Sequence, residues 1–173
     1  SGNALLDVGT GTGKISFEAL KQYPGITCTG ADFSAGMLEV AERRRLKEGH
    51  SPEEIRFVQA DAQALPLDDS QFDAVISGYL IRNVPDIAKT LAEQHRVLKT
   101  GGTVVCMDTA PPERPLIRRL TNFYFRHIIP GIGRLLTSDR DAYSYLTNST
   151  LGFKRPTEIV SCFRDAGFDQ VEY

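Results

Sequence analysis

A glycine-alternating turn near the start of the chain most constrains its fold. Residues 5–8 are apolar apart from Asp7, and glycines follow at positions 9, 11 and 13. Glycine lets a backbone turn tightly and approach a ligand closely, and a helix that follows such a turn points its free N–H groups at the ligand. The pattern therefore predicts the nucleoside-binding loop of an α/β domain, between its first strand and its first helix.

The spacing of the loop discriminates between cofactors. A dinucleotide fingerprint, G-x-G-x-x-G, needs glycine at position 14, where this chain has Lys14. A phosphate-binding P-loop needs glycine at position 8 and serine or threonine at position 15, where the chain has Val8 and Ile15. We therefore expect the loop to bind S-adenosylmethionine. The predicted cofactor contacts in the loop are Asp7, Gly9, Thr10, Gly11 and Gly13.

Two further carboxylates are predicted to reach the same crevice. Asp32 ends a predicted strand at 27–32, and Asp61 follows another at 55–59. Ligands of open α/β sheets bind outside the carboxyl ends of parallel strands, where these side chains and Asp7 converge. Asp32 is predicted to accept hydrogen bonds from the ribose hydroxyls, and Asp61 from the adenine amino group. The structural alternatives are a helix cap for Asp32 and a turn residue for Asp61. The other predicted cofactor contacts are Phe33, Met37, Ala62 and Ser77.

Short apolar segments alternate with amphipathic ones along most of the chain. This alternation predicts a Rossmann-like α/β fold, a mostly parallel sheet with helices on both faces. The predicted strands are 4–8, 27–32, 55–59, 74–77, 103–108 and 169–172, and the predicted helices are 14–22, 34–47, 87–98 and 157–165. Gly101 and Gly102 are expected to end the third helix, and Gly167 the last one.

Composition narrows the class of protein. A length of 173 residues suits a single domain with its own core. The net charge of −2 argues against a nucleic-acid partner, and no apolar run is long enough to span a bilayer. The three cysteines have no metal-ligand spacing, which favours reduced thiols in a cytoplasmic protein without a bound metal.

Residues 111–150 interrupt the alternation between the fifth strand and the last helix. Prolines open this insertion, and aromatic, basic and aliphatic residues follow. Its position predicts a substrate cover over the carboxyl ends of the strands. Between 111 and 140 the insertion carries six arginines against Glu113 and Asp139, a net charge of +4. The cover is predicted to rest on an anionic membrane surface; the alternative is a lid whose apolar side packs on the sheet.

Several segments resemble the ubiquinone/menaquinone biosynthesis C-methyltransferases. They are "LLDVGTGTGKIS", "GADFSAGML", "FVQADAQALPLDDSQFDAV", "IRNVPD", "RVLKTGG" and "FYFRHIIPGIGRLLTSDRDAYSYL". The first half is similar to class I S-adenosylmethionine methyltransferases in general, whereas the insertion and the Arg82-Asn83 pair are more specific. The resemblance implies methylation of a ring carbon of a polyprenylated quinol precursor. The family's N-terminal helices and final strand are expected to be missing from this chain.

The chain departs from the family's usual residues on the substrate side. Tyr79-Leu80-Ile81 stands before Arg82 where the family usually has Phe-Gly-Leu. Residues 108–110 are Asp-Thr-Ala where the family usually has Glu-Phe-Ser, and Thr100 replaces a proline. The substitutions leave the exact quinol open.

The expected reaction assigns catalytic roles by charge. The methyl of a sulfonium is electrophilic, and a ring carbon beside a phenol is nucleophilic once the phenol, with a pKa of about 10, has ionised. Arg82 is predicted to favour the phenolate, and Asn83 to orient a water molecule or the second ring oxygen. His127 is the predicted proton acceptor and Tyr145 the predicted ring contact. The structural alternatives are an ion pair for Arg82 and a packed core position for His127.

Two other functions compete with this assignment. The chain is also compatible with methylation of another small molecule, or with a non-catalytic, cofactor-binding partner in an assembly. A nicotinamide oxidoreductase is disfavoured by Lys14. The sequence leaves open whether the chain forms homo-oligomers.

Overall fold

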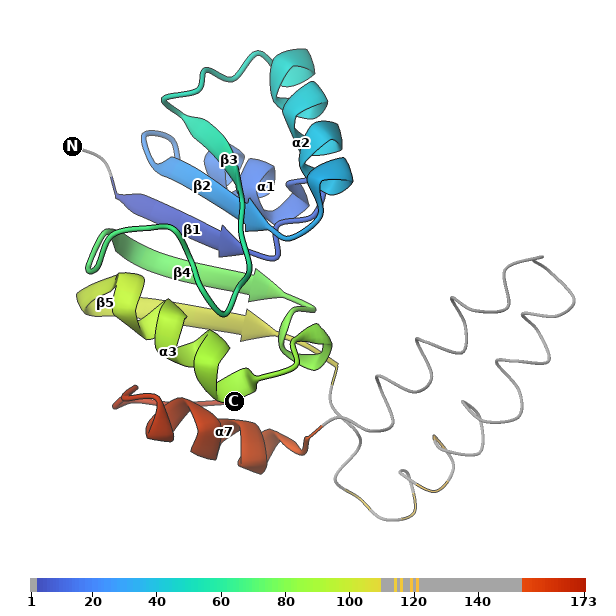
Figure 1. Ribbon diagram of the computed structural model, residues 1–173, viewed down its shortest axis with the longest axis vertical. Helices are drawn as coiled ribbons and strands as arrows, with labels where there is room; N and C mark the ends of the chain where they lie inside the picture. Colours follow the sequence, from blue (N-terminus) through green and yellow to red (C-terminus); the bar gives the residue numbers. More distant parts are fainter. Residues whose placement is uncertain (1–2, 110–113, 115, 117–118, 120, 122–153) are drawn as a thin grey trace, which may run out of the picture. The chain divides into compact units, whose positions relative to one another are not determined.

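The computed structural model describes residues 3–109, 114, 116, 119, 121 and 154–173 (Figure 1). The chain divides into two compact units. The first contains Ser1–Asp108 and Cys162–Gln170, and the second contains Thr109–Ser161 and Val171–Tyr173. The first unit holds the sheet and all of the predicted cofactor contacts.

The first unit is built on a five-stranded parallel sheet, as the alternating pattern predicts. The strands are β1 (Ala4–Val8), β2 (Thr27–Asp32), β3 (Ile55–Gln59), β4 (Phe72–Gly78) and β5 (Leu98–Met107). Their spatial order is β3-β2-β1-β4-β5, and every neighbouring pair is parallel (Figure 1). Strand order reverses between β1 and β4, and ligands of open α/β sheets bind at such a switch point.

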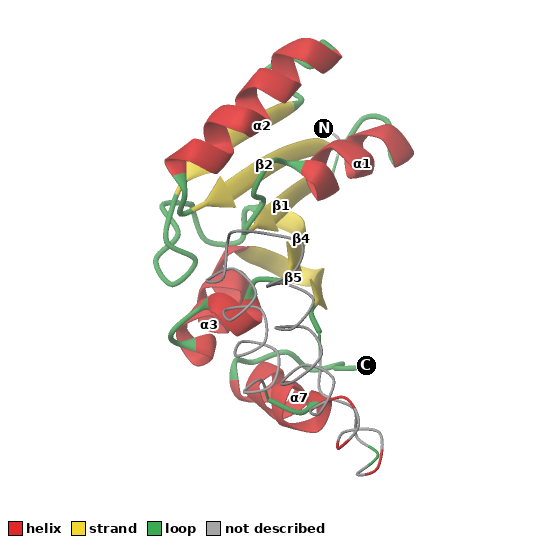
Figure 2. Ribbon diagram, turned by 90° about the vertical axis from the view of Figure 1, so that its right-hand side faces the viewer, coloured by secondary structure: helices red, strands yellow, loops and turns green. Residues whose placement is uncertain are grey.

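Helices cover both faces of this sheet. They are α1 (Lys14–Gln22), α2 (Ala35–Glu48) and α3 (Ile87–Val97), with a short 3₁₀ helix η1 (Ile81–Asn83) after β4 and α7 (Pro156–Asp165) near the end of the chain. The chain runs outward in one direction through β2 and β3 and in the other through β4 and β5. Right-handed crossovers therefore place α1 and α2 on one face and α3 on the other; Figure 2 shows α1 and α3 on opposite sides of the strands.

The core follows from the two-residue period of the strands. On β1, Leu5 belongs to a buried cluster with Phe17 of α1, and its neighbour Leu6 to a second cluster with Val97 of α3. Successive side chains of a strand point to opposite faces, so both faces of β1 are covered by apolar side chains. Burial on both faces accounts for the nearly continuous apolar sequence of this central strand.

The predicted role of Gly101 and Gly102 in ending the third helix was wrong, although the helix itself ends within one residue of its predicted bound. Helix α3 ends at Val97, and β5 begins at the next residue, Leu98, which already has extended dihedrals. Gly101 and Gly102 therefore lie inside β5. Gly101 has a φ of 80°, and a Cβ on Gly102 would lie 2.9 Å from the carbonyl oxygen of Asp73. These glycines lie where the register between β4 and β5 shifts. Such irregularities in a strand favour glycine, as helix ends do.

The predicted sixth strand was also wrong. Residues 169–172 are not in a strand. Gly167 ends α7 as predicted, with a φ of 100°, and Phe168 N–H then bonds to the carbonyl of Phe163. The ring of Phe168 lies 5.3 Å from that of Phe163 and 5.1 Å from that of His95. Phe168 thus closes the last turn of α7, and the residues after it do not extend the sheet.

Candidate active site

The β1–α1 loop has the tight geometry that its glycines predict. Gly9, Gly11 and Gly13 have φ values of 74°, 56° and 77°, in the left-handed region that side chains disfavour. A Cβ on Gly13 would lie 2.7 Å from the Phe17 ring, and one on Gly9 would lie 3.0 Å from Leu80. Both conformation and space therefore require glycine at these two positions.

Asp7 lies fully buried beneath this loop. Its Oδ2 accepts hydrogen bonds from the hydroxyls of Thr10 at 2.8 Å and Ser16 at 2.6 Å. Within the described part of the chain, Oδ1 has no hydrogen-bond partner. Burial raises the pKa of the Asp7 carboxyl, although the bonds from Ser16 and Thr10 oppose the rise. Asp7 thus joins the loop to the first turn of α1; its predicted contact with the cofactor stays a prediction.

Asp32 holds the other side of the loop. Its Oδ2 accepts a hydrogen bond from the backbone N–H of Gly11 at 2.7 Å, and its Oδ1 accepts one from Ser34 N–H at 2.9 Å. Ser34 in turn caps α2, because its hydroxyl accepts from Met37 N–H at 3.4 Å. Ser34, and not Asp32, therefore provides the helix cap that was the structural alternative for Asp32. Each oxygen of a carboxylate has a second acceptor position, so Asp32 can still receive hydroxyl donors from a ligand.

Two apolar side chains beside Asp32 are exposed. Phe33 is 76% exposed and Met37 is 47% exposed. Both are accessible to a ligand beside the Asp32 carboxylate, and their predicted contacts with the cofactor stay predictions.

Asp61 adopts the turn that was its structural alternative. Its Oδ1 accepts from Gln63 N–H at 2.9 Å, and it forms an isolated bridge with Ala64. Ala62 packs against the core cluster on the α3 face. The turn leaves the Asp61 side chain exposed, and its contact with adenine stays a prediction.

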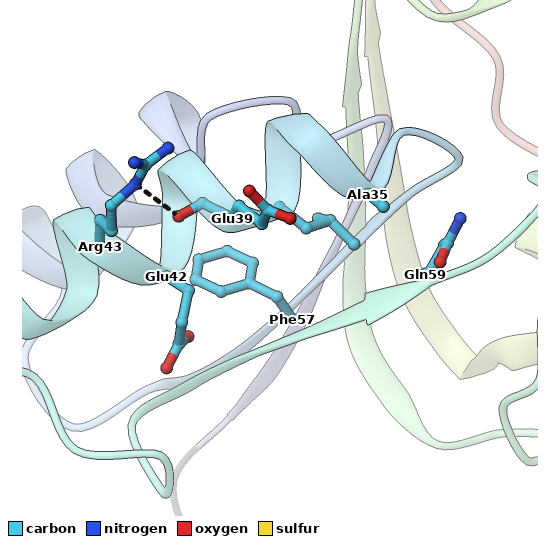
Figure 3. A pocket seen from close by; sticks show the side chains of 7 residues that line it. Ala35, Glu39, Glu42, Arg43, Phe57 and Gln59 are labelled. Atoms are coloured by element: carbon cyan, nitrogen blue, oxygen red, sulfur yellow. Dashed lines mark hydrogen bonds between the residues drawn. The ribbon is translucent and has the colours of Figure 1, made fainter.

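A separate open groove lies between α2 and the edge strand β3 (Figure 3). It has a volume of about 580 Å³ and is lined by Ala35, Leu38, Glu39, Glu42, Arg43, Phe57 and Gln59. The Phe57 ring lies beneath the helix, and Arg43 Nε donates to the Glu39 carbonyl at 3.3 Å. None of the predicted cofactor contacts lines the groove, so we distinguish it from the cofactor site.

Ser77 lies buried at the carboxyl end of β4. Its hydroxyl is 3.0 Å from the sulfur of Cys106 on β5. Burial raises the pKa of the Cys106 thiol to about 11, so the thiol is protonated and a poor nucleophile at neutral pH. This pair packs the two strands together, and the predicted cofactor contact of Ser77 stays a prediction.

Arg82 forms the ion pair that was its structural alternative. Its Nε lies 3.5 Å from Oδ1 of Asp108, and its backbone N–H donates to Oδ2 of the same residue at 3.1 Å. The side chains are only 13% and 8% exposed. The sequence placed Asp108 at the end of the predicted fifth strand and on the substrate side but assigned it no role, although Asp32 at the end of β2 offered a precedent.

Tyr79 was missed without any such precedent. It has a φ of 57°, a left-handed conformation that is strained for an aromatic residue. Its N–H donates to the Met107 carbonyl at 2.8 Å, and its carbonyl accepts from Asn83 Nδ2 at 2.7 Å. Its ring centroid lies 5.1 Å from Arg82 Cζ. Asn83, predicted to orient a water or ring oxygen, thus stabilises the turn that carries Arg82.

The predicted proton acceptor and ring contact in the insertion, His127 and Tyr145, lie outside the described residues. Their roles stay predictions, as does the cover formed by residues 111–150.

Comparison with known proteins identifies a family. The model of the ubiE/COQ5 methyltransferase family matches residues 1–173. A ubiquinone/menaquinone biosynthesis C-methyltransferase UbiE of Desulfotalea psychrophila is 44% identical over 169 residues, which cover 98% of this chain and 67% of that protein. A demethylmenaquinone methyltransferase of Roseiflexus castenholzii is 39% identical over 173 residues, which cover 97% and 68% of the two chains.

Solved structures share the fold. YcgJ from Bacillus subtilis superposes with a TM-score of 0.71 at 25% identity, over 95% of this chain and 61% of that one. CrArsM, an arsenic(III) S-adenosylmethionine methyltransferase from Chlamydomonas reinhardtii, gives a TM-score of 0.69 at 28% identity, over 96% and 52%. These similarities confirm the predicted Rossmann-like fold of class I methyltransferases.

Proposed function

Because the chain belongs to the ubiE/COQ5 methyltransferase family, we propose that it methylates a ring carbon of a prenylated quinol precursor. The family and the fold make it an S-adenosylmethionine-dependent methyltransferase. The observation that carries the substrate class is the match to quinone-biosynthesis methyltransferases over nearly the whole chain, including the segment that carries Arg82 and Asn83.

The conformation of the β1–α1 loop supports the proposed cofactor site. The left-handed glycines open the backbone to close approach by a ligand. We propose that Asp32 receives the ribose hydroxyls on its remaining acceptor positions and that Phe33 and Met37 flank the adenine. When bound, S-adenosylmethionine supplies an electrophilic methyl group.

The protein's contribution to the reaction is to favour an ionised phenol and to hold it in line with the methyl. A guanidinium remains charged in proteins, so Arg82 acts by electrostatic attraction and donates hydrogen bonds to the phenolate. Positioning of the reacting carbon supplies much of the acceleration. The proton acceptor proposed for the phenol is His127, whose unperturbed pKa is near neutrality.

The substrate class is tested with the purified protein, S-adenosylmethionine and a reduced demethylmenaquinone with a short prenyl tail. Mass spectrometry should detect a product heavier by one methylene, with the label of a methyl-labelled cofactor on the ring carbon. A catechol and a phenolic acid serve as competing acceptors. Faster methylation of either competitor, or transfer to oxygen, would reject the proposed quinol and favour methylation of another small molecule.

We also propose that the insertion contacts the membrane that holds a lipid-tailed substrate. Among the described residues, no helix combines the length and apolar character needed to cross a bilayer. The support for peripheral contact is the net charge of +4 between residues 111 and 140, in a chain whose total is −2. Basic residues are attracted to anionic lipid surfaces.

A further inference from the structure

An ion pair lies at the carboxyl ends of β4 and β5, and the proposed reaction gives a role to only one of its two residues. The last paired residues of the two strands are Gly78 and Met107. Tyr79 and Asp108 therefore start their loops side by side, and the N–H of Tyr79 still bonds to the Met107 carbonyl. Residues 79 and 80 then lead into η1, in which the side chain of Arg82 lies against that of Asp108.

Asp108 contacts Arg82 at two separate points. One carboxylate oxygen accepts the backbone N–H of Arg82 at 3.1 Å, and the other lies 3.5 Å from its Nε. The first contact is a hydrogen bond that holds the main chain of η1, and the second is an ion-pair contact, longer than a hydrogen bond, at the inner edge of the guanidinium. Since both side chains are about nine-tenths buried, solvent screens this pair far less than a surface pair.

These contacts limit which way the guanidinium faces. The group is planar, with Nε on one edge and the two Nη groups at the far end. Asp108 takes the Nε edge, while the ring of Tyr79 lies 5.1 Å from Cζ. An ion-pair partner at the Nε edge and a ring beside Cζ restrict the directions in which the Nη groups can point.

We propose that Asp108 is a positioning residue for the methyl transfer, which aims the Nη groups of Arg82 at the phenolate oxygen of the substrate. The proposal rests on the proposed function. Asp108 acts through Arg82 and does not itself touch the reacting atoms. An error of about 1 Å in such positioning can lower a rate about a hundredfold.

Asp73 provides a matched control. It lies at the other end of β4, where both carboxylate oxygens are 2.9 Å from Nζ of Lys99 and one accepts the backbone N–H of Ala4 at 2.8 Å. Asp73→Asn therefore removes the negative charge from another β4 carboxylate that contacts both a cation and a backbone N–H, between more exposed side chains and remote from the cofactor loop.

The kinetic test compares Asp108→Asn with Asp73→Asn in the full chain. We expect Asp108→Asn to lower kcat at least about tenfold while the Kd for S-adenosylmethionine changes less than about twofold, and Asp73→Asn to leave kcat unchanged. Asp108→Glu should restore most of the loss. In an Arg82→Ala background, Asp108→Asn should cost nothing more, because it acts through Arg82. An unchanged kcat in Asp108→Asn, or an equal further loss in the Arg82→Ala background, would overturn the proposal.

A measurement without substrate separates this inference from the proposed function. The ¹⁵Nε–¹Hε signal of Arg82, assigned from its loss in Arg82→Ala, should shift and broaden in Asp108→Asn and stay in place in Asp73→Asn. An unchanged signal in Asp108→Asn would overturn the restraint on Arg82. A shifted signal in a protein that does not methylate quinols would uphold that restraint and reject the proposed function.

Discussion

The backbone amide of Gly11 donates a hydrogen bond of 2.7 Å to Oδ2 of Asp32. This bond ties the glycine loop after β1 to the end of β2. The other carboxylate oxygen holds the N–H of Ser34, the residue that caps α2. Asp32 therefore shapes the loop before any ligand arrives, and its substitution should affect both the loop and the hydrogen bonds to a ribose.

Asp32→Ala should weaken the binding of S-adenosylmethionine by roughly 2–4 kcal/mol, because two charge-assisted hydrogen bonds to the ribose are lost. Isothermal titration calorimetry gives this value directly. Ser34→Ala is the control, since it removes the α2 cap at a cost of about 1 kcal/mol in stability and leaves the carboxylate in place. Unchanged affinity in Asp32→Ala, or tighter binding of NADH than of S-adenosylmethionine, would contradict the assigned site.

Arg82→Ala should reduce turnover far more than it weakens cofactor binding. The residue is proposed to act on the substrate's phenolate, and it contacts Asp108 and Tyr79 at the carboxyl ends of β4 and β5. Arg82→Lys should recover only part of the activity, because an ammonium restores the charge but not the planar, two-pronged geometry. Turnover and cofactor affinity are measured on the same preparations. Full activity in Arg82→Ala would rule out the role.

The parts of the site that follow from the parallel sheet could be predicted from the sequence. Asp32 and the glycines of the loop are where the strand–turn–helix pattern predicts them, since strand ends converge at one edge. The same reasoning applies to Asp108, which the sequence placed at the end of the predicted strand at 103–108 and on the substrate side, although no role was assigned to it. The glycines at 101 and 102 hid only the first part of that strand. The strand in fact runs from Leu98 to Met107.

Other features could not be predicted because they depend on packing between distant segments. Nothing local to Tyr79 favours a left-handed conformation; Met107 and Asn83 impose it through hydrogen bonds at 2.8 and 2.7 Å. The strand predicted at 169–172 is likewise absent; the preceding residue, Phe168, packs against Phe163 and His95 at the end of α7. Tertiary context overrides a short apolar pattern in such cases.

Gln94→Leu should stabilise the protein. Gln94 lies fully buried on α3, and within the described part of the chain neither its amide oxygen nor its amide nitrogen has a hydrogen-bond partner. An unpartnered buried polar group costs about 1–3 kcal/mol, so leucine of similar size should raise the unfolding free energy by a comparable amount.

Thr90→Val is the matched control for Gln94→Leu. Thr90 is equally buried on α3, but its hydroxyl donates to the Asp86 carbonyl at 2.9 Å. Its replacement should give no gain and cost up to about 1 kcal/mol. Urea unfolding of both variants decides the point: equal or lower stability of Gln94→Leu would show that the amide is satisfied in solution.

Asp7→Asn should change the pH dependence of stability. Burial raises the pKa of Asp7 in the folded protein, so folding favours the protonated carboxyl. That contribution is fully present below the unfolded pKa of about 3.9 and is lost as pH rises through the folded pKa. Asparagine does not titrate, so the stability of the variant relative to the wild type should increase with pH. Urea unfolding between about pH 4 and pH 8 measures this; a difference that is constant or falls with pH would contradict it.

Binding to lipid vesicles should require anionic lipid and weaken with salt. Each basic residue near such a surface contributes about 1 kcal/mol, so the net charge of +4 between 111 and 140 supports reversible adsorption, and salt screens the attraction. Arg118→Gln with Arg126→Gln should reduce sedimentation with anionic vesicles. Arg43→Gln with Lys47→Gln removes the same charge from exposed positions on α2 and should not. Equal sedimentation with neutral and anionic vesicles, none with either, or equal losses in the two double variants would mean that the insertion does not bind the membrane through its charge.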